Sequence, residues 1–401
     1  MKVLQINATY GYGSTGLIMS DIGEAVKDSG NEAYFAYQSS RTQVENGYRI
    51  GSTFDWKAHA FLCRLLGKQG YYSIFATRKF LKHLDKISPD VVHLHNLHSN
   101  FINLNMLLKH LAKKDIPTVI TMHDCWYFTG KCFHYVDVNC TKFTSGCGNC
   151  PKKSDSPKSL IFDSSARVLK DREKYLSSIP RLKIAGCSEW ICNEAKKGIM
   201  RGFDITTIRN GVDTDIFKSR DKQALKKIFG FEDKFVIMGM ANKWLSPLNA
   251  VFLEKIVTSL SEDEKIIIVG CKETHKAMLE KYSDRVMSVG FVTDRSKLAE
   301  YYAMSDVFVN VTHADTLPTV NMESICCGTP VVTYNSCGSP ELVLEGCGHV
   351  VLENDVDEII NKIKLVKKEG CAGCAEIGKK SFEKQMCYEG YIDLYREIVE
   401  P

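Results

Sequence analysis

Short apolar runs alternate with longer amphipathic segments along the whole chain. Apolar runs bounded by polar or Gly positions predict buried strands, and apolar residues three or four positions apart predict helices. The expected strands fall into two consecutive sets, which are 2–8, 33–37, 91–95, 118–123, 183–187 and 206–209, followed by 235–241, 265–270, 286–289, 307–311, 330–334 and 348–351. The expected helices between them include 17–29, 102–114, 248–260, 295–304 and 356–369.

Strands that alternate with helices predict parallel sheets with right-handed crossovers. Two such sets predict an α/β protein of two doubly wound, Rossmann-like domains, with the boundary in the charged stretch 217–231. The expected domains are 1–217, with a Cys-rich insertion at 125–151, and 218–384. Residues 385–401 carry Tyr388, Tyr391 and Tyr395 at helical spacing and predict a C-terminal helix.

Composition narrows the class of protein. The 401 residues are 44% hydrophobic and 25% charged, and the net charge of +4 is too small to indicate nucleic-acid binding. No apolar run approaches the roughly 20 residues of a membrane span, and the first residues are typical of a strand rather than a signal peptide. Sixteen cysteines without an export signal favour reduced thiols, so we expect a cytoplasmic protein.

The most specific stretch begins at Asp315 and ends at Gly328. Pro318 and Gly328 predict the two ends of a short helix, because Pro is favoured at a first helical position and Gly just past the end. The backbone N–H groups of Thr319 and Val320 would then be available to a diphosphate. The helix start therefore predicts a phosphate-binding site.

Two carboxylates flank seven residues in this stretch, Asp315 before the helix and Glu323 one turn inside it. Glu323 could accept hydrogen bonds from both hydroxyls of a ribose. The segment resembles the donor-binding motif of retaining glycosyltransferases of family 4, with Asp315 where Glu is usual. The resemblance implies a GT-B fold, in which two Rossmann-like domains face each other across a cleft and the last helix returns to the first domain.

The resemblance also implies roles for residues. Glu323 would bind the ribose, Thr319 and Val320 beside Pro318 the diphosphate, and Asp315 the hydroxyls of the donor sugar. It implies front-face attack with a donor phosphate oxygen taking the acceptor's proton. Catalysis in this family needs no metal.

Gly11-Tyr-Gly13-Ser-Thr-Gly16 follows the first strand and opens a helix, matching G-x-G-x-x-G. An NAD enzyme would need an acid at the end of the second strand, and none is present. Arg41 leaves an NADP enzyme as an alternative. In family 4 enzymes such a loop lies against the donor diphosphate and the acceptor, which suits Gly13 and Gly16. A tight strand-to-helix turn explains the glycines equally well.

Histidines end two strands of the first set, at His93-Leu-His95 and at His123-Asp124. Alternate strand residues share a face, so the His-x-His pair could bind a metal. No third ligand of suitable spacing is nearby, and ligands of any kind bind at the carboxyl ends of parallel strands. The strand-end position therefore favours His95 as a polar residue of the cleft. Resemblance marks His123 as the residue that approaches the donor sugar and Asp124 as a second cleft residue. The alternative for His123 is a buried residue that closes its strand.

Asn210-Gly-Val-Asp213 closely matches the hinge motif of the family. Family members then place an Arg and, a few residues later, a Lys that together hold the donor phosphates. Here Lys243 takes the Arg position, and Leu248 stands at or beside the Lys position. Neutralising the leaving diphosphate is the main electrostatic task of such an enzyme, so we expect Lys243 to supply the charge.

The insertion holds four cysteines, with a C-x2-C pair at its end: Cys132, Cys140, Cys147 and Cys150. The pair is a good half-site for tetrahedral zinc, although the other two spacings are wide. Structural zinc, reduced packing thiols and a redox-active pair are all consistent with this pattern. A second C-x2-C, at Cys371 and Cys374, has no partner cysteines close in sequence, which favours an incidental pair.

We therefore expect a hexosyltransferase-type enzyme, moving a sugar from a nucleotide-diphosphate sugar to a glycan or lipid-linked acceptor, in surface polysaccharide biosynthesis. Two alternatives are a non-catalytic nucleotide-sugar-binding protein and a GT-B nucleotide-sugar epimerase. Residues 56–86 mix lysines and arginines with aromatic residues. This segment suits either a solvated surface or peripheral contact with the inner face of a membrane. No nucleic-acid partner is expected.

Overall fold

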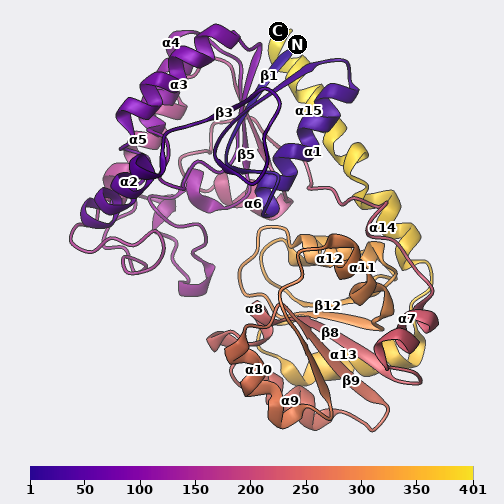
Figure 1. Ribbon diagram of the computed structural model, residues 1–401. Coiled ribbons are helices and arrows are strands. Elements are labelled where there is room, and N and C mark those ends of the chain that lie inside the picture. The colour runs from indigo at the N-terminus through magenta and orange to yellow at the C-terminus, as the bar shows by residue number, and fades with distance from the viewer. Residues whose placement is uncertain (401) are drawn as a thin grey trace. The chain divides into compact units, whose positions relative to one another are not determined.

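The computed structural model describes residues 1–400 and divides into two compact units. The first unit contains residues 1–210 together with the C-terminal residues from 385 onward, and the second contains residues 211–384. The chain thus passes from the first unit to the second and back again (Figure 1).

The first unit is built on a seven-stranded parallel sheet of order β3-β2-β1-β4-β5-β6-β7. Its strands are β1 (Lys2–Tyr10), β2 (Glu32–Ser40), β3 (Gly47–Arg49), β4 (Val91–Leu94), β5 (Thr118–Met122), β6 (Leu182–Gly186) and β7 (Ile205–Thr207). Every residue of β4 and β5 is buried. Strands covered by helices on both faces require continuous apolar runs, which explains the pattern of the sequence.

Helices pack around this sheet. They are α1 (Ser14–Asp28), α2 (Thr53–Leu66), α3 (Ile74–Ile87), α4 (Leu104–Lys113), α5 (Ser165–Leu176), α6 (Glu189–Ala195) and α15 (Lys384–Val399). Polar side chains at the N-caps fix several helix starts: Ser52 and Asp55 form a capping box on α2, and Asn103 accepts from Met106 N–H on α4.

The second unit has a six-stranded parallel sheet of order β10-β9-β8-β11-β12-β13. Its strands are β8 (Phe235–Met240), β9 (Glu264–Val269), β10 (Val286–Val289), β11 (Val307–Asn310), β12 (Val331–Tyr334) and β13 (Gly348–Val351). Its helices are α7 (Lys222–Phe229), α8 (Ala241–Trp244), α9 (Phe252–Ser259), α10 (Glu273–Leu279), α11 (Arg295–Met304), α12 (Thr319–Cys326), α13 (Val356–Glu369) and α14 (Cys374–Phe382).

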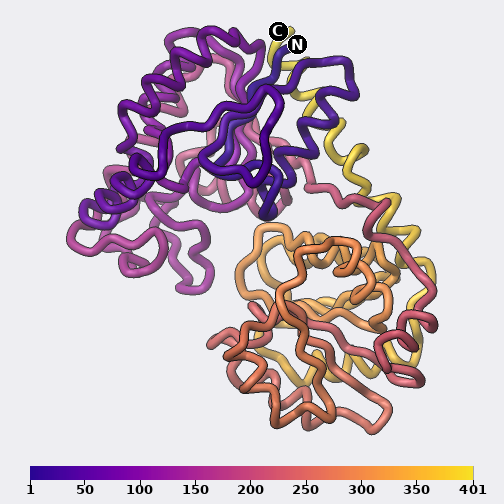
Figure 2. Tube along the Cα trace, viewed as in Figure 1, coloured from indigo at the N-terminus to yellow at the C-terminus, as the bar shows by residue number. Residues whose placement is uncertain are grey.

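Helix α15 completes the core of the first unit. It lies beside α1, and the two ends of the chain come together there (Figure 2). Tyr395 Oη lies 2.6 Å from His93 Nδ1, His93 Nε2 lies 2.7 Å from Thr121 Oγ1, and Thr121 donates to Tyr391 Oη at 2.9 Å. All four side chains are buried, so this chain of hydrogen bonds satisfies polar groups that water cannot reach.

The observed elements agree with the expected ones to within a few residues, with three differences. The short edge strand β3 carries only three residues and was not predicted. The segment expected as one helix over 248–260 is a 3-10 turn followed by α9. The unit boundary falls after Asn210 rather than after residue 217, because Val212 N–H donates to Phe382 O and Lys384 pairs with Asp213 at 3.2 Å.

The buried tyrosine of α15 provides a test of this packing. Tyr395→Phe removes the donor to His93 and leaves a buried ring nitrogen unpaired, which should lower the free energy of unfolding by about 1–3 kcal/mol. Urea unfolding followed by circular dichroism measures the change, with Tyr48→Phe on a partly exposed strand as the control. Equal midpoints for Tyr395→Phe and the unmodified protein would contradict this account.

Candidate active site

Helix α12 begins directly after the loop that leaves β11. Pro318 is its N-cap instead of its first helical residue, so the helix begins at Thr319, one position later than expected. Asn321 N–H donates to Pro318 O at 3.0 Å, while the N–H groups of Thr319 and Val320 precede the point where intrahelical bonds begin. These two residues are partly exposed. The helix start can therefore bind an anion through its backbone and its dipole.

Glu323 lies one turn inside α12. Its Oε2 accepts a hydrogen bond from the hydroxyl of Tyr302 on α11 at 3.3 Å. Burial raises the pKa of Glu323 to about 7. A carboxylate that is poorly solvated in this way gains strongly from new donors, so a pair of ligand hydroxyls would stabilise its ionised form.

Lys243 and Asp315 approach each other at the same end of the sheet. Lys243 follows β8 in the short helix α8, and its Nζ donates to Thr312 Oγ1 at 2.8 Å and lies 3.9 Å from Asp315 Oδ2. The lysine and aspartate side chains are 28% and 34% exposed, so both can still contact a ligand. The pair places a cation and an anion beside the start of α12.

A buried tryptophan positions Lys243. Trp244 Nε1 donates to Val309 O at 2.8 Å, and the indole lies on Gly239 of β8. A Cβ at position 239 would lie 2.1 Å from the ring, so only glycine permits this approach. Packing of Trp244 thus fixes the direction of the preceding residue.

Asn249 is the residue of this site that sequence reasoning missed. Its Nδ2 donates to Lys243 O and to Val311 O, both at 3.0 Å, and its Oδ1 lies 2.9 Å from His313 Nε2. His313 Nδ1 in turn lies 3.1 Å from Glu353 Oε2. Leu248, by contrast, is 63% exposed. The inward-facing position beside Leu248 therefore carries a neutral amide that ties together the two loops flanking Lys243.

The glycine loop of the first unit joins β1 to α1. Gly13 has a φ of +67°, and a Cβ at Gly16 would lie 2.7 Å from Thr9 Oγ1. The turn itself requires both glycines. Their role in ligand binding stays a prediction.

Two histidines meet at the carboxyl ends of β4 and β5. His95 Nδ1 lies 3.1 Å from His123 Nε2, and His95 Nε2 lies 3.0 Å from Gln5 Oε1. Gln5 Oε1 can only accept, so His95 donates to it from Nε2. His95 Nδ1 then accepts a hydrogen bond from the Nε2–H of His123. Burial lowers the pKa of His123 to about 4, so its imidazole is neutral at physiological pH.

His95 is fully buried with protein partners on both nitrogens, so it orients His123 instead of contacting a substrate as expected. His93 likewise has partners on both nitrogens, which leaves neither ring of the His-x-His pair a lone pair for a metal. His123 itself is only partly buried. The metal interpretation of this pair therefore lacks support.

Asp124 uses its two oxygens within the first unit. Oδ1 accepts from Trp126 N–H at 2.9 Å, and Oδ2 lies 2.9 Å from His98 Nε2. The carboxylate thus holds the following 3-10 turn and His98, a positioning role where substrate contact was expected. Asn210 ends the first unit, and its Oδ1 is buried without a hydrogen-bond partner among residues 1–400.

Comparison with protein families identifies both units. Residues 19–216 match the model of Glycosyltransferase Family 4, and residues 233–368 match that of Glycosyl transferases group 1. The chain is a family 4 glycosyltransferase. The resemblance carried by Asp315 and Glu323 is confirmed, and so is the enzyme class.

Two relatives illustrate the range of the family. WcaC of Escherichia coli K12, a glycosyl transferase assigned to colanic acid biosynthesis, is 23% identical over 77% of each chain. The alpha-monoglucosyldiacylglycerol synthase of Acholeplasma laidlawii is 22% identical over 83% of this chain and 81% of its own.

Solved structures confirm the GT-B fold of this glycosyltransferase. A sucrose-phosphate synthase of Thermosynechococcus elongatus superposes with a TM-score of 0.71 at 13% identity, covering 99% of this chain and 98% of that one. Anabaena HepE in complex with UDP superposes with a TM-score of 0.67 at 16% identity, covering 99% and 100%.

The raised pKa of Glu323 predicts a pH dependence of nucleotide binding. If Glu323 binds the ribose as expected, only its ionised form can accept both hydroxyls. Affinity for a nucleoside diphosphate such as UDP should then rise roughly tenfold from pH 6 to pH 8 as Glu323 loses its proton. Titration calorimetry across this range measures the effect. Glu323→Gln is the control, because the ligand's own phosphate titrates near pH 6 in both proteins. Parallel profiles for the two proteins would refute the assignment.

Proposed function

We propose that this enzyme moves a sugar from a nucleotide-diphosphate sugar to a glycan or lipid-linked acceptor, with retention of the anomeric configuration. The observation that carries the donor assignment is the arrangement at α12, where a helix start, a partly buried carboxylate at Glu323 and the Lys243–Asp315 pair lie within one unit. These groups match the diphosphate, the ribose and the sugar of one ligand.

The relatives and structural neighbours support a donor and acceptor of this class. HepE structures contain UDP or UDP-glucose, and the two relatives are a glycosyl transferase of colanic acid biosynthesis and a monoglucosyldiacylglycerol synthase. By analogy, we propose a role in the synthesis of a surface polysaccharide or glycolipid.

Charge develops on the leaving diphosphate as the bond between the sugar's anomeric carbon and the phosphate oxygen breaks. In the proposed mechanism, Lys243 and the N–H groups at the start of α12 stabilise that charge. The acceptor hydroxyl attacks from the same face and passes its proton to a phosphate oxygen of the leaving group. His123, kept neutral by burial and oriented by its hydrogen bond with His95, would bind a hydroxyl of the donor sugar.

The neutral amide of Asn249 supports a second candidate function, that of a non-catalytic nucleotide-sugar-binding protein. Family members commonly carry two cations here, and this site has an amide where the second is expected. A protein with a single phosphate-binding cation could bind the donor without transfer. Donor turnover with and without acceptors separates the candidates: transfer needs an acceptor, an epimerase isomerises the donor alone, and a binding protein does neither.

Lys243 gives the sharpest test of the enzymatic role. Lys243→Ala should lower kcat by roughly a hundredfold with little change in donor affinity, because its charge acts mainly in the transition state. Lys243→Arg should retain part of the rate. Steady-state kinetics over a panel of nucleotide sugars provides the measurement, with Lys255→Ala on the exposed face of α9 as the control. Full activity of Lys243→Ala would show that another group holds the diphosphate.

We also propose that the first unit rests on an anionic membrane surface. Among residues 1–400, no helix is long and apolar enough to cross a membrane. Large apolar side chains are nevertheless exposed on one face of α2 and in the loop before α5, a set that we term the α2 patch: Phe54, Phe61, Leu160, Ile161 and Phe162. Leu160 N–H donates to Arg64 O and Ser164 Oγ to Leu66 O, which hold this loop against the end of α2.

Basic side chains surround the α2 patch. Lys57 and Arg64 share the exposed face of α2 with Phe54 and Phe61, and Lys158 precedes the loop. Apolar side chains that insert into the interface, combined with basic groups at the headgroups, fit an anionic lipid bilayer. Such contact would bring a lipid-linked acceptor to the enzyme.

Vesicle binding tests the α2 patch. The protein should co-sediment with vesicles containing phosphatidylserine, bind pure phosphatidylcholine vesicles more weakly, and lose about tenfold in affinity with the double change Phe61→Ser and Phe162→Ser. Ile228→Ser, which alters an equally exposed residue of α7, should have no effect. Vesicle binding that is unchanged in the double variant, or absent in the unmodified protein, would refute the membrane proposal.

A further inference from the structure

The segment between β5 and α5 has little regular structure. From residue 125 to residue 164 it contains only three short 3-10 turns, η1 (Cys125–Phe128), η2 (Val136–Val138) and η3 (Lys142–Thr144). A chain of this length without helix or strand ladders has few backbone bonds to hold it together. Small irregular segments of this kind commonly need a covalent or metal cross-link.

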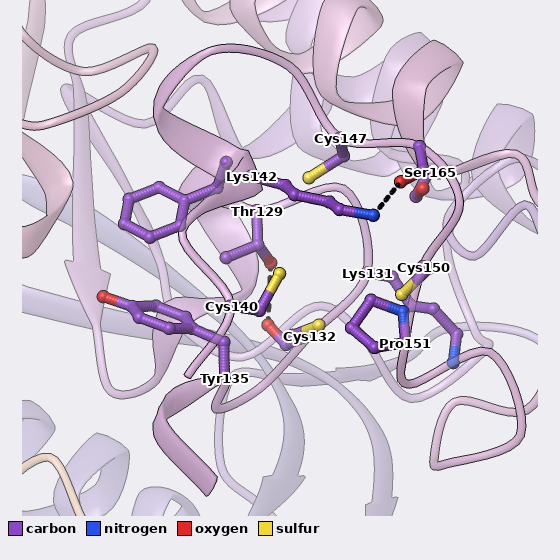
Figure 3. Close-up of a pocket in the computed structure, with 12 residues that line it drawn as sticks. Thr129, Lys131, Cys132, Tyr135, Cys140, Lys142, Cys147, Cys150, Pro151 and Ser165 are labelled. Atoms are coloured by element: carbon purple, nitrogen blue, oxygen red, sulfur yellow. Dashed lines mark hydrogen bonds between the residues drawn. The ribbon is translucent and has the colours of Figure 1, made fainter. Parts of the chain in front are cut away.

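The four cysteines of this insertion line a single cavity (Figure 3). These cysteines are separated by up to eighteen positions in the sequence, yet all four contribute to the wall of the cavity: Cys132, Cys140, Cys147 and Cys150. The thiols of Cys132 and Cys150 lie close enough to interact with each other. The space available at its centre is about 20 Å³, which is room for one water-sized sphere.

An N–H donor and two cations lie at the cavity and can stabilise thiolates, although burial raises the pKa of the Cys147 thiol. Gly130 N–H donates to Cys147 Sγ at 3.3 Å, and the side chains of Lys131 and Lys142 also line the cavity. Lys142 Nζ donates to two carbonyl oxygens between Cys147 and Cys150, Gly148 O at 3.1 Å and Asn149 O at 2.7 Å. N–H donors and nearby cations are the groups that support thiolate ligands of a metal.

We propose that Cys132, Cys140, Cys147 and Cys150 together bind one Zn²⁺ ion that fixes the fold of the insertion. Four thiolates are the donor set of structural zinc, and binding would release the four thiol protons. Among residues 1–400, no three such side chains already stand at the spacing that holds an ion. The site therefore requires Cys140 and Cys147 to turn toward the Cys132–Cys150 pair, closing the cavity around the metal.

The proposed ion would stabilise one wall of the active-site rim. Cys125 N–H donates to Phe133 O at 2.8 Å, and the Phe133 ring lies 4.3 Å from that of His98, the partner of Asp124. Phe133 directly follows Cys132. Loss of the ion should loosen this contact as well as the insertion, so zinc acts here on structure and not on the transfer chemistry.

Metal analysis of the intact protein is the first test. Protein purified under reducing conditions without added zinc should contain about one equivalent by mass spectrometry of the native protein. Its four insertion thiols should resist alkylation until a chelator removes the ion. Absence of metal together with free alkylation of all four thiols would overturn the proposal, and so would a Cys132–Cys150 disulfide in that sample.

A matched pair of variants locates the ion. Cys147→Ser should lose the zinc and lower the thermal midpoint, whereas Cys371→Ser should keep both. Cys371 is the informative control, because it belongs to a second group of interacting thiols in the other unit, which are Cys347, Cys371 and Cys374. Loss of zinc from Cys371→Ser, or its retention in Cys147→Ser, would refute the site. If Cys147→Ser does not fold, alkylation of the unmodified protein with and without chelator decides the matter.

Discussion

Both units depend on one constraint: their strands are parallel, and the central ones are buried on both faces. Parallel strands are joined by helical crossovers, so all strands of a sheet end at the same edge. The loops that follow their carboxyl ends therefore lie together at one rim of the sheet. Polar chemistry is therefore concentrated at this rim of each sheet, which carries His123 after β5 in the first unit and Lys243 after β8 in the second. The proposed donor site is a consequence of this arrangement.

Burial at the rim then dictates how each polar group is used. His93, His95 and Asn249 are buried and meet protein partners, so they position their neighbours. Glu323 is the contrasting case. Its protein hydrogen bond is a long one to Tyr302, and burial raises its pKa to about 7. A carboxylate whose burial is offset by only one weak hydrogen bond is typical of a ligand-binding residue.

The elements and the donor motif were predictable from sequence because they depend on local patterns. Apolar runs located β4 and β5, and Pro318 and Gly328 bounded α12. Contacts between distant segments were not predictable: no local signal joins Tyr395 to His93, or Asn249 to His313. The same holds for Cys347, which approaches Cys371 and Cys374 only after the fold forms. Edge strand β3 was missed because three residues form no pattern.

Hydrogen exchange in the presence of UDP tests the central claim, that the donor nucleotide binds at the start of α12. With binding verified by calorimetry, peptides covering 312–323 and 239–249 should exchange more slowly in the complex than in the unbound protein. Exchange elsewhere in the second unit should stay nearly unchanged. Unaltered exchange at 312–323 in protein saturated with nucleotide, with protection in another part of the chain, would contradict the account.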